Sequence, residues 1–198
     1  MKIQILIGST RPGRIAERVA KWVAASAQEQ PNFEVELVDL ADYDMPFFDE
    51  ATSPQFNPHR QTSAVVKKFL AKVSQADGYV TVTPEYNYSI PGVLKNALDY
   101  IALELAKKPV AVVSYGAVGG ARAAEHLKTM LFALKAPVVP MSLSLIGPHS
   151  LIDEDGKYIG NSASPYGPDK LLLRQLGELA WYAETLKAGR EELVIANV

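Results

Sequence analysis

The fold of this chain is decided by residues 78–100, which read GYVTVTPEYNYSIPGVLKNALDY. The run from Tyr79 to Thr83 is rich in β-branched residues and is typical of a buried strand. From Val93 onward, apolar residues recur at helical spacing, and Pro91 stands near the first turn, where a missing N–H costs little. The intervening loop has a tyrosine on each side of Asn87. A stiff turn alone would explain the prolines but not these rings, so we expect a binding loop.

The composition excludes several classes of function. The chain has 198 residues, of which 48% are hydrophobic and 21% are charged, as in a folded globular domain. Its formal net charge of −2 gives no basis for binding nucleic acid or an anionic membrane. It contains no cysteine, which excludes thiolate and iron–sulfur chemistry, and its three histidines have no metal-ligand spacing. We therefore predict no metal site.

Neither a targeting segment nor a membrane segment is predicted. The first residues contain too short an apolar run for a signal peptide, and no later stretch is long enough to span a bilayer. We expect a cytoplasmic protein with no membrane partner.

Strands and helices alternate along the chain. The predicted strands are residues 3–7, 33–40, 79–83, 110–115 and 137–145, and the predicted helices are residues 15–27, 63–75, 93–101, 124–134 and 168–186. This alternation predicts a parallel sheet with helices on both faces, and right-handed crossovers leave few layouts. The strand order 2-1-3-4-5 fits five strands and gives a three-layer α/β sandwich of the flavodoxin-like type. No linker or internal repeat divides the chain, so residues 1–198 are predicted to form a single domain.

Two long irregular segments interrupt this pattern. Residues 41–61 contain three prolines and three phenylalanines, Phe47, Phe48 and Phe56. A loop of this length is usually functional or part of an interface, and we expect this one near a subunit contact. Residues 146–166 include the run Asp153–Gly156, which has too few spaced carboxylates for a calcium loop and is predicted to be a solvated turn.

The predicted strand order brings loops 9–14, 84–92 and 114–120 to one end of the sheet. The first of these loops leads from a strand to a helix N-terminus, where free backbone N–H groups and the helix dipole favour an anion. Ser9 and Thr10 add hydroxyl groups, and Arg11 and Arg14 add positive charge suited to phosphate. The loop matches neither a P-loop nor Gly-x-Gly-x-x-Gly, so a single phosphate fits it best.

The other two loops suit a flat ligand. Tyr86 and Tyr88 offer ring faces, whose contacts with another ring are worth about 0.5–1.5 kcal/mol beyond burial, and Asn87 offers an amide. The third loop contributes glycines, which let backbone N–H groups approach a ligand closely: Gly116, Gly119 and Gly120. A helix follows these glycines, and its dipole can stabilise negative charge. Alone, the glycines indicate an ordinary tight turn; the three loops together indicate a binding site.

The three loops resemble the NADPH-dependent FMN reductase family, which includes quinone, chromate and azo-dye reductases. The resemblance covers residues 1–134 and is carried by Gly8–Arg14, Pro84–Asp99 and Gly116–Arg122, of which the second is the most specific. It implies a flavodoxin-like fold, non-covalent FMN, NADPH or NADH as co-substrate, and a homodimer or homotetramer with its site near a subunit contact.

The resemblance also implies a set of cofactor-binding residues. Ser9, Arg11 and the N–H groups of residues 13–15 (Gly13, Arg14 and Ile15) would hold the phosphate. The isoalloxazine and ribityl groups would be bordered by Pro84, Glu85, Tyr86 and Asn87, and on the other side by Ser114, Tyr115, Gly116 and Gly119. Many relatives have a second serine three residues after the first loop's arginine. This chain has Arg14 there, which leaves the role of that side chain at the phosphate open.

The resulting prediction is an oxidoreductase that transfers hydride from NAD(P)H to bound FMN and then to a small acceptor such as a quinone, azo dye, chromate or free flavin. The flavin carries the chemistry, so no side chain is assigned as catalytic. The alternatives are a flavodoxin-type electron carrier, a non-catalytic flavin-binding protein, and a scaffold without flavin. Such carriers tend to be strongly acidic, whereas this chain is nearly neutral. The sequence identifies neither the acceptor nor a preference between NADPH and NADH, nor does it choose between dimer and tetramer.

Overall fold

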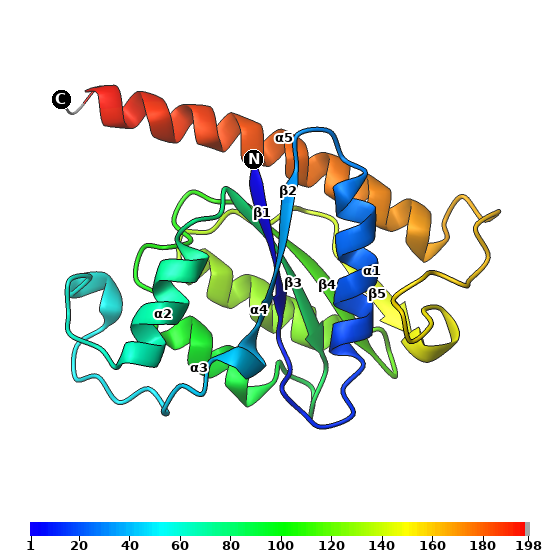
Figure 1. The fold of residues 1–198 in the computed structure, drawn as a ribbon, viewed down its shortest axis with the longest axis horizontal. Coiled ribbons are helices and arrows are strands. Elements are labelled where there is room, and N and C mark those ends of the chain that lie inside the picture. The colour runs from blue at the N-terminus through cyan, green and yellow to red at the C-terminus, as the bar shows by residue number, and fades with distance from the viewer. Residues whose placement is uncertain (197–198) are drawn as a thin grey trace.

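A parallel β-sheet with helices on both faces forms the framework of residues 1–196, which are the residues that the computed structural model describes (Figure 1). The last two residues of the predicted domain, 197–198, lie outside this part. The strands are β1 (Lys2–Ile7), β2 (Glu34–Asp39), β3 (Gly78–Pro84), β4 (Val110–Gly116) and β5 (Leu143–Ile146). The helices are α1 (Ala16–Gln28), α2 (Ala64–Val73), α3 (Gly92–Asp99), α4 (Ala121–Ala133) and α5 (Pro168–Ala196). Short 3-10 helices are η1 (Leu40–Asp42), η2 (Pro54–Phe56) and η3 (Pro148–Ser150).

The strand order is β2-β1-β3-β4-β5 with every pair parallel, which confirms the predicted topology. β3 lies at the centre, paired with β1 on one side and β4 on the other, and all of its residues are buried. This burial explains its unbroken apolar and β-branched sequence, because a strand of a doubly covered sheet has no solvent face. β2 forms an edge, as its alternation of apolar and acidic residues predicts.

The fifth strand is shorter than the prediction of residues 137–145. β5 comprises only Leu143–Ile146, and the segment before it touches the sheet through one isolated bridge between Val110 and Val138. Pro137 and Pro140 explain the difference, since proline has no N–H to give to the ladder and is confined to strand edges and ends.

Each face of the sheet has its own hydrophobic core. On one face, β-strand residues such as Ile5 and Val80 pack with residues of α1 and α5. On the other face, residues such as Leu6 and Val112 pack with α2, α3 and α4. In Figure 1 the last turns of α5, drawn in red, extend beyond the other elements.

The long segment after β2 is fixed to α3. The Asn96 side chain accepts a hydrogen bond from Phe48 N at 2.9 Å and donates one to the Pro46 carbonyl at 2.8 Å. The Phe48 ring packs edge-on against Tyr100, with ring centres 5.2 Å apart. Phe47 and Phe56 are left 85% and 86% exposed.

The carboxyl ends of the strands meet at the lower edge of the sheet in Figure 1, where β1 leads to α1 and β3 leads to α3. The loops predicted to bind a ligand are therefore neighbours, together with the start of the segment after β2. No helix among residues 1–196 is long and apolar enough to cross a membrane. The same part of the chain contains no group of three or more metal-ligating side chains.

Candidate functional site

The first loop, residues 8–15, follows β1, and its first residue lies close to the backbone of β3. Gly8 N donates to the Val82 carbonyl at 2.9 Å, and a side chain at Gly8 would place its Cβ 2.9 Å from that oxygen. Gly13 has a φ of +69°, which glycine adopts without strain. Gly8 is therefore required where the loop leaves β1, and Gly13 suits the turn that leads into α1.

This loop presents unpaired backbone donors at the start of α1. The N-cap residue, Ile15, makes no side-chain capping bond. In the part of the chain that the structure describes, the N–H groups of Thr10, Gly13 and Ile15 have no hydrogen-bond partner. A helix N-terminus with free donors carries partial positive charge and favours an anion.

The second loop is a strained two-residue turn. Tyr86 and Ser89 exchange backbone hydrogen bonds of 2.9 and 3.0 Å, with Asn87 at φ 49° and Tyr88 at φ 66° between them. Positive φ at both central positions is the geometry of a type I′ turn, which normally takes glycine, asparagine or aspartate. A tyrosine in this conformation costs free energy, and such residues cluster at functional sites.

Tyr86 joins the second loop to the first. Its hydroxyl lies 3.0 Å from the hydroxyl oxygen of Ser9, a residue with no exposed surface. The Arg11 guanidinium lies 5.9 Å from the centre of the Tyr86 ring, within the range of a cation–π contact. Two of the predicted phosphate-binding residues and a predicted ring-binding residue are therefore in contact.

The third loop is held by its own chain. Ser114 is fully buried and its hydroxyl donates to the Gly119 carbonyl at 2.8 Å. Gly119 and Gly120 have φ values of +74° and +73°, and a Cβ on Gly120 would lie 2.7 Å from Tyr115 N. The glycines are thus required by the turn itself, and the Ser114 hydroxyl is engaged inside the loop.

Glu85 locks the second and third loops together. Its carboxylate accepts hydrogen bonds from Arg122 N at 3.0 Å and Ala123 N at 3.4 Å, which caps the first turn of α4. It also pairs with the Arg122 guanidinium at 3.2 Å, and its side chain is only 9% exposed. Arg122 in turn lies 4.0 Å above the ring centre of Tyr88. Beside these groups is an open pocket of about 440 Å³, lined by Glu85, Asn87, Tyr88, Ala117, Val118 and Arg122.

Tyr115 carries a buried hydroxyl with no hydrogen-bond partner among the described residues. It stands at the carboxyl end of β4, next to Pro84 of β3, and is 6% exposed. Burial raises the pKa of this phenol above its ordinary value, the Tyr86 phenol raises it further, and the Arg14 guanidinium opposes both effects. Buried polar groups normally have partners, so this hydroxyl is a donor left without an acceptor among the described residues at this end of the sheet.

Arg14 is placed differently from Arg11. Its guanidinium donates to the Ser9 carbonyl at 2.6 Å and to both carboxylate oxygens of Asp39, one of them at 3.0 Å. From the sequence alone, the role of Arg14 at the phosphate is open, and no local pattern singles out Asp39. The strand order offered a signal for Asp39, because β2 is next to β1 and its carboxyl end must adjoin the first loop.

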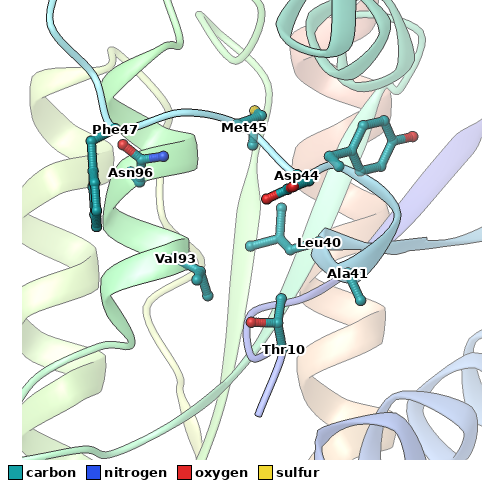
Figure 2. Close-up of a pocket in the computed structure, with 9 residues that line it drawn as sticks. Thr10, Leu40, Ala41, Asp44, Met45, Phe47, Val93 and Asn96 are labelled. Atoms are coloured by element: carbon teal, nitrogen blue, oxygen red, sulfur yellow. The ribbon is translucent and has the colours of Figure 1, made fainter. Parts of the chain in front are cut away.

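A second pocket, of about 460 Å³, lies between residues 40–47 and α3, next to Thr10 of the first loop (Figure 2). Figure 2 shows Val93 and Asn96 of α3 facing Leu40 and Ala41, with Thr10 at one end. Asp44, Met45, Phe47 and Tyr43 complete its lining. Apart from Thr10 and the general expectation for residues 41–61, sequence reasoning missed this pocket.

Comparison with known proteins gives consistent matches. The family model described as NADPH-dependent FMN reductase matches residues 1–148. An NAD(P)H-dependent FMN reductase of Schizosaccharomyces pombe is 38% identical over 76% of this chain and 76% of its own length. A quinone reductase of Escherichia coli is 37% identical over 70% of this chain and 73% of its own. An NADPH azoreductase of a Bacillus species is 32% identical over 98% of each chain.

A solved structure supports the fold. The NAD(P)H:acceptor oxidoreductase FerB of Paracoccus denitrificans superposes with a TM-score of 0.68, at 20% identity, over 94% of this chain and 97% of that one.

Proposed function

The chain belongs to the NADPH-dependent FMN reductase family, and from this premise we propose that it oxidises NAD(P)H and reduces a small, flat acceptor such as a quinone or an azo dye. FMN supplies the hydride and electron transfer when it is bound. The protein's part is to hold FMN, to orient it and to shape the space in which both substrates meet it.

The observation that carries the proposal is the set of free donors at the first loop. Within residues 1–196, the N–H groups of Thr10, Gly13 and Ile15 have no hydrogen-bond partner, and Arg11 beside them is exposed. This set fits one phosphate group, because it combines backbone donors, a helix N-terminus and one guanidinium. We propose that it holds the phosphate of FMN.

The second and third loops would border the ring system. We assign this role to the backbone of residues 84–88 and 116–119, together with the Tyr86 ring and the Asn87 amide. Glu85 is committed to α4 and to Arg122, so we do not assign it as an acid or base. Its proposed contribution is to keep the two loops at a fixed separation.

We infer the class of acceptor from the names of relatives and from the lining of one pocket. Relatives are named quinone reductase and azoreductase. The pocket of Figure 2 adjoins Thr10 and is lined by apolar side chains, including Met45, Phe47 and Val93, which suit a flat apolar molecule.

The proposal is tested with the purified protein reconstituted with FMN. Rapid mixing with NADPH or NADH without oxygen should bleach the flavin absorbance, and addition of benzoquinone or an azo dye should restore it over many turnovers. An electron carrier would not be reduced by NAD(P)H at a useful rate, and a scaffold would bind no FMN. Either result would overturn the proposed function.

A further inference from the structure

We propose that Arg14 is a positioning residue: it holds the first loop in shape through Asp39 and does not itself bind phosphate. The inference rests on the proposed function, because it assumes that the first loop receives the phosphate of FMN. It assigns a role to the side chain at which this sequence departs from the usual motif of its family, and to an aspartate outside that motif.

Both terminal nitrogens of the Arg14 guanidinium are engaged by Ser9 and Asp39. One terminal nitrogen, Nη1, donates to the Ser9 carbonyl at 2.6 Å and to Asp39 Oδ1 at 3.0 Å, and the other, Nη2, donates to Asp39 Oδ2. Glu17 lies farther off, with its carboxylate 4.0 Å from Nη2. A bidentate contact of this kind fixes the orientation of the guanidinium as well as its distance from the carboxylate.

Burial makes this pair costly to open. The Arg14 and Asp39 side chains are only 13% and 21% exposed. If Arg14 turned to a phosphate, it would leave a partly buried carboxylate without its partner and the Ser9 carbonyl without its donor. Removing one member of such a pair costs far more than an exposed ion pair contributes. Arg11 is exposed and has no ion pair among residues 1–196, so it can turn to a phosphate without this loss.

Asp39 also contacts η1, which lines the pocket of Figure 2. Its Oδ1 also accepts a hydrogen bond from Ala41 N at 2.9 Å and so caps η1. Leu40 and Ala41 of η1 line that pocket together with Thr10 of the first loop. Arg14 therefore connects the phosphate-binding loop to one wall of the pocket proposed for the acceptor.

The experiment compares Arg14→Ala, Asp39→Asn and the double variant, each titrated with FMN and with riboflavin, which lacks the phosphate. Breaking a charge-assisted contact should weaken FMN binding by about tenfold in each single variant. The double variant should be no weaker than either single one, because both changes break the same contact. Riboflavin affinity should change little, so the preference for FMN over riboflavin falls; a general loss of stability would weaken both ligands together.

Asp39→Asn is the decisive variant, because it keeps the volume of the side chain and leaves Arg14 in place. If Arg14 binds phosphate directly, freeing it from Asp39 should leave the FMN dissociation constant unchanged or lower it, and that result would overturn the inference. If Asp39→Asn does not fold, Arg14→Lys decides: weaker FMN binding despite the retained charge supports the inference, and wild-type binding overturns it.

Asp77→Asn is the matched control. Asp77 pairs with Lys187 and Arg190, is 17% exposed, and lies at the opposite end of the sheet from the first loop. Its loss should lower stability without changing the preference for FMN over riboflavin. Hydrogen exchange should show faster exchange at residues 39–47 in Asp39→Asn than in this control. Failure of the wild-type protein to bind FMN would reject the proposed function, whereas normal FMN binding by Asp39→Asn rejects only the role of Arg14.

Discussion

Arg11 and Arg14 lie three residues apart in one loop, yet the structure gives them opposite surroundings. Arg14 is partly buried against Asp39, whereas Arg11 is exposed and its guanidinium lies over the face of the Tyr86 ring. Residue type alone favoured both arginines as phosphate ligands. The difference between them depends on a carboxylate 25 residues further along the chain, which no local motif includes.

Arg11→Ala is expected to weaken FMN binding by about ten- to a hundredfold, because a charge-assisted hydrogen bond contributes about 1.5–3 kcal/mol. Quenching of flavin fluorescence on binding measures the dissociation constant. Riboflavin should bind the variant and the wild-type protein alike, and the melting temperature without flavin should not change. An unaltered FMN dissociation constant would mean that Arg11 is only a surface turn residue.

Two substitutions of Asn87 distinguish a role in orienting the flavin ring from a role in forming the turn. At φ 49°, alanine is strained by about 1–2 kcal/mol whereas glycine is not, so Asn87→Ala should lower the melting temperature more than Asn87→Gly. Both variants lose the amide. Hydride transfer needs the reacting atoms about 3–3.5 Å apart, so both should keep most FMN but oxidise NADPH at least about tenfold more slowly per bound flavin. Full activity of Asn87→Gly in single-turnover reduction would show that only the turn matters.

At the scale of the elements, the strand order could be predicted from the sequence, because alternating strands and helices with right-handed crossovers leave few layouts. β3 is buried throughout and rich in β-branched residues, β2 alternates, and Pro91 is the N-cap of α3. The limits of β5 were predicted wrongly because proline prevents hydrogen bonding to the neighbouring strand. The apolar pattern of a single segment does not show which residues must make those hydrogen bonds. The contacts of Glu85 with α4 and of Asn96 with Phe48 were missed for the same reason, since they join elements distant in sequence.

The attachment of the edge strand β2 gives a pH-dependent prediction. Glu36 receives hydrogen bonds from Gln4 of β1 at 2.9 Å and from Lys72 of α2 at 2.8 Å, and pairs with Lys2 at 3.1 Å. Burial raises its pKa, but these hydrogen bonds and charges outweigh it and lower the pKa from 4.5 to about 2. The carboxylate therefore stabilises the fold above pH 4.5, and this contribution is lost as the pH falls toward 2.

Glu36→Gln should accordingly lower the free energy of unfolding at pH 7, by about 0.5–1 kcal/mol for a pair near the surface. The difference from wild type should shrink as the pH falls below 4.5. Urea unfolding at a series of pH values measures it. Glu34→Gln, an exposed position on the same strand, is the control and should show no such trend. A difference that stayed constant with pH would mean that packing, and not charge, makes Glu36 important.

At the scale of the whole molecule, the segment of residues 46–56 keeps large apolar side chains exposed. Asn96 and Tyr100 hold residues 46–48 in place, and a partly buried pair of Arg60 with Glu50 holds the next part of the same segment. The segment is thus ordered by many contacts, yet Phe47 and Phe56 remain 85% and 86% exposed. Large apolar side chains held in exposed positions usually mark an interface, and Phe47 also lines the pocket of Figure 2.

We therefore predict a homo-oligomer, at least a dimer, with this segment at the contact. Light scattering at micromolar concentration should give a mass above that of one chain, 21.6 kDa. The double variant Phe47→Ser, Phe56→Ser should shift the protein toward monomers without unfolding it, because both side chains are exposed within one chain. Phe132→Ser, at a 65% exposed position on α4, serves as the control for loss of an apolar surface group elsewhere. A monomeric wild-type protein would reject the prediction, and a double variant that remains oligomeric would place the contact on another face.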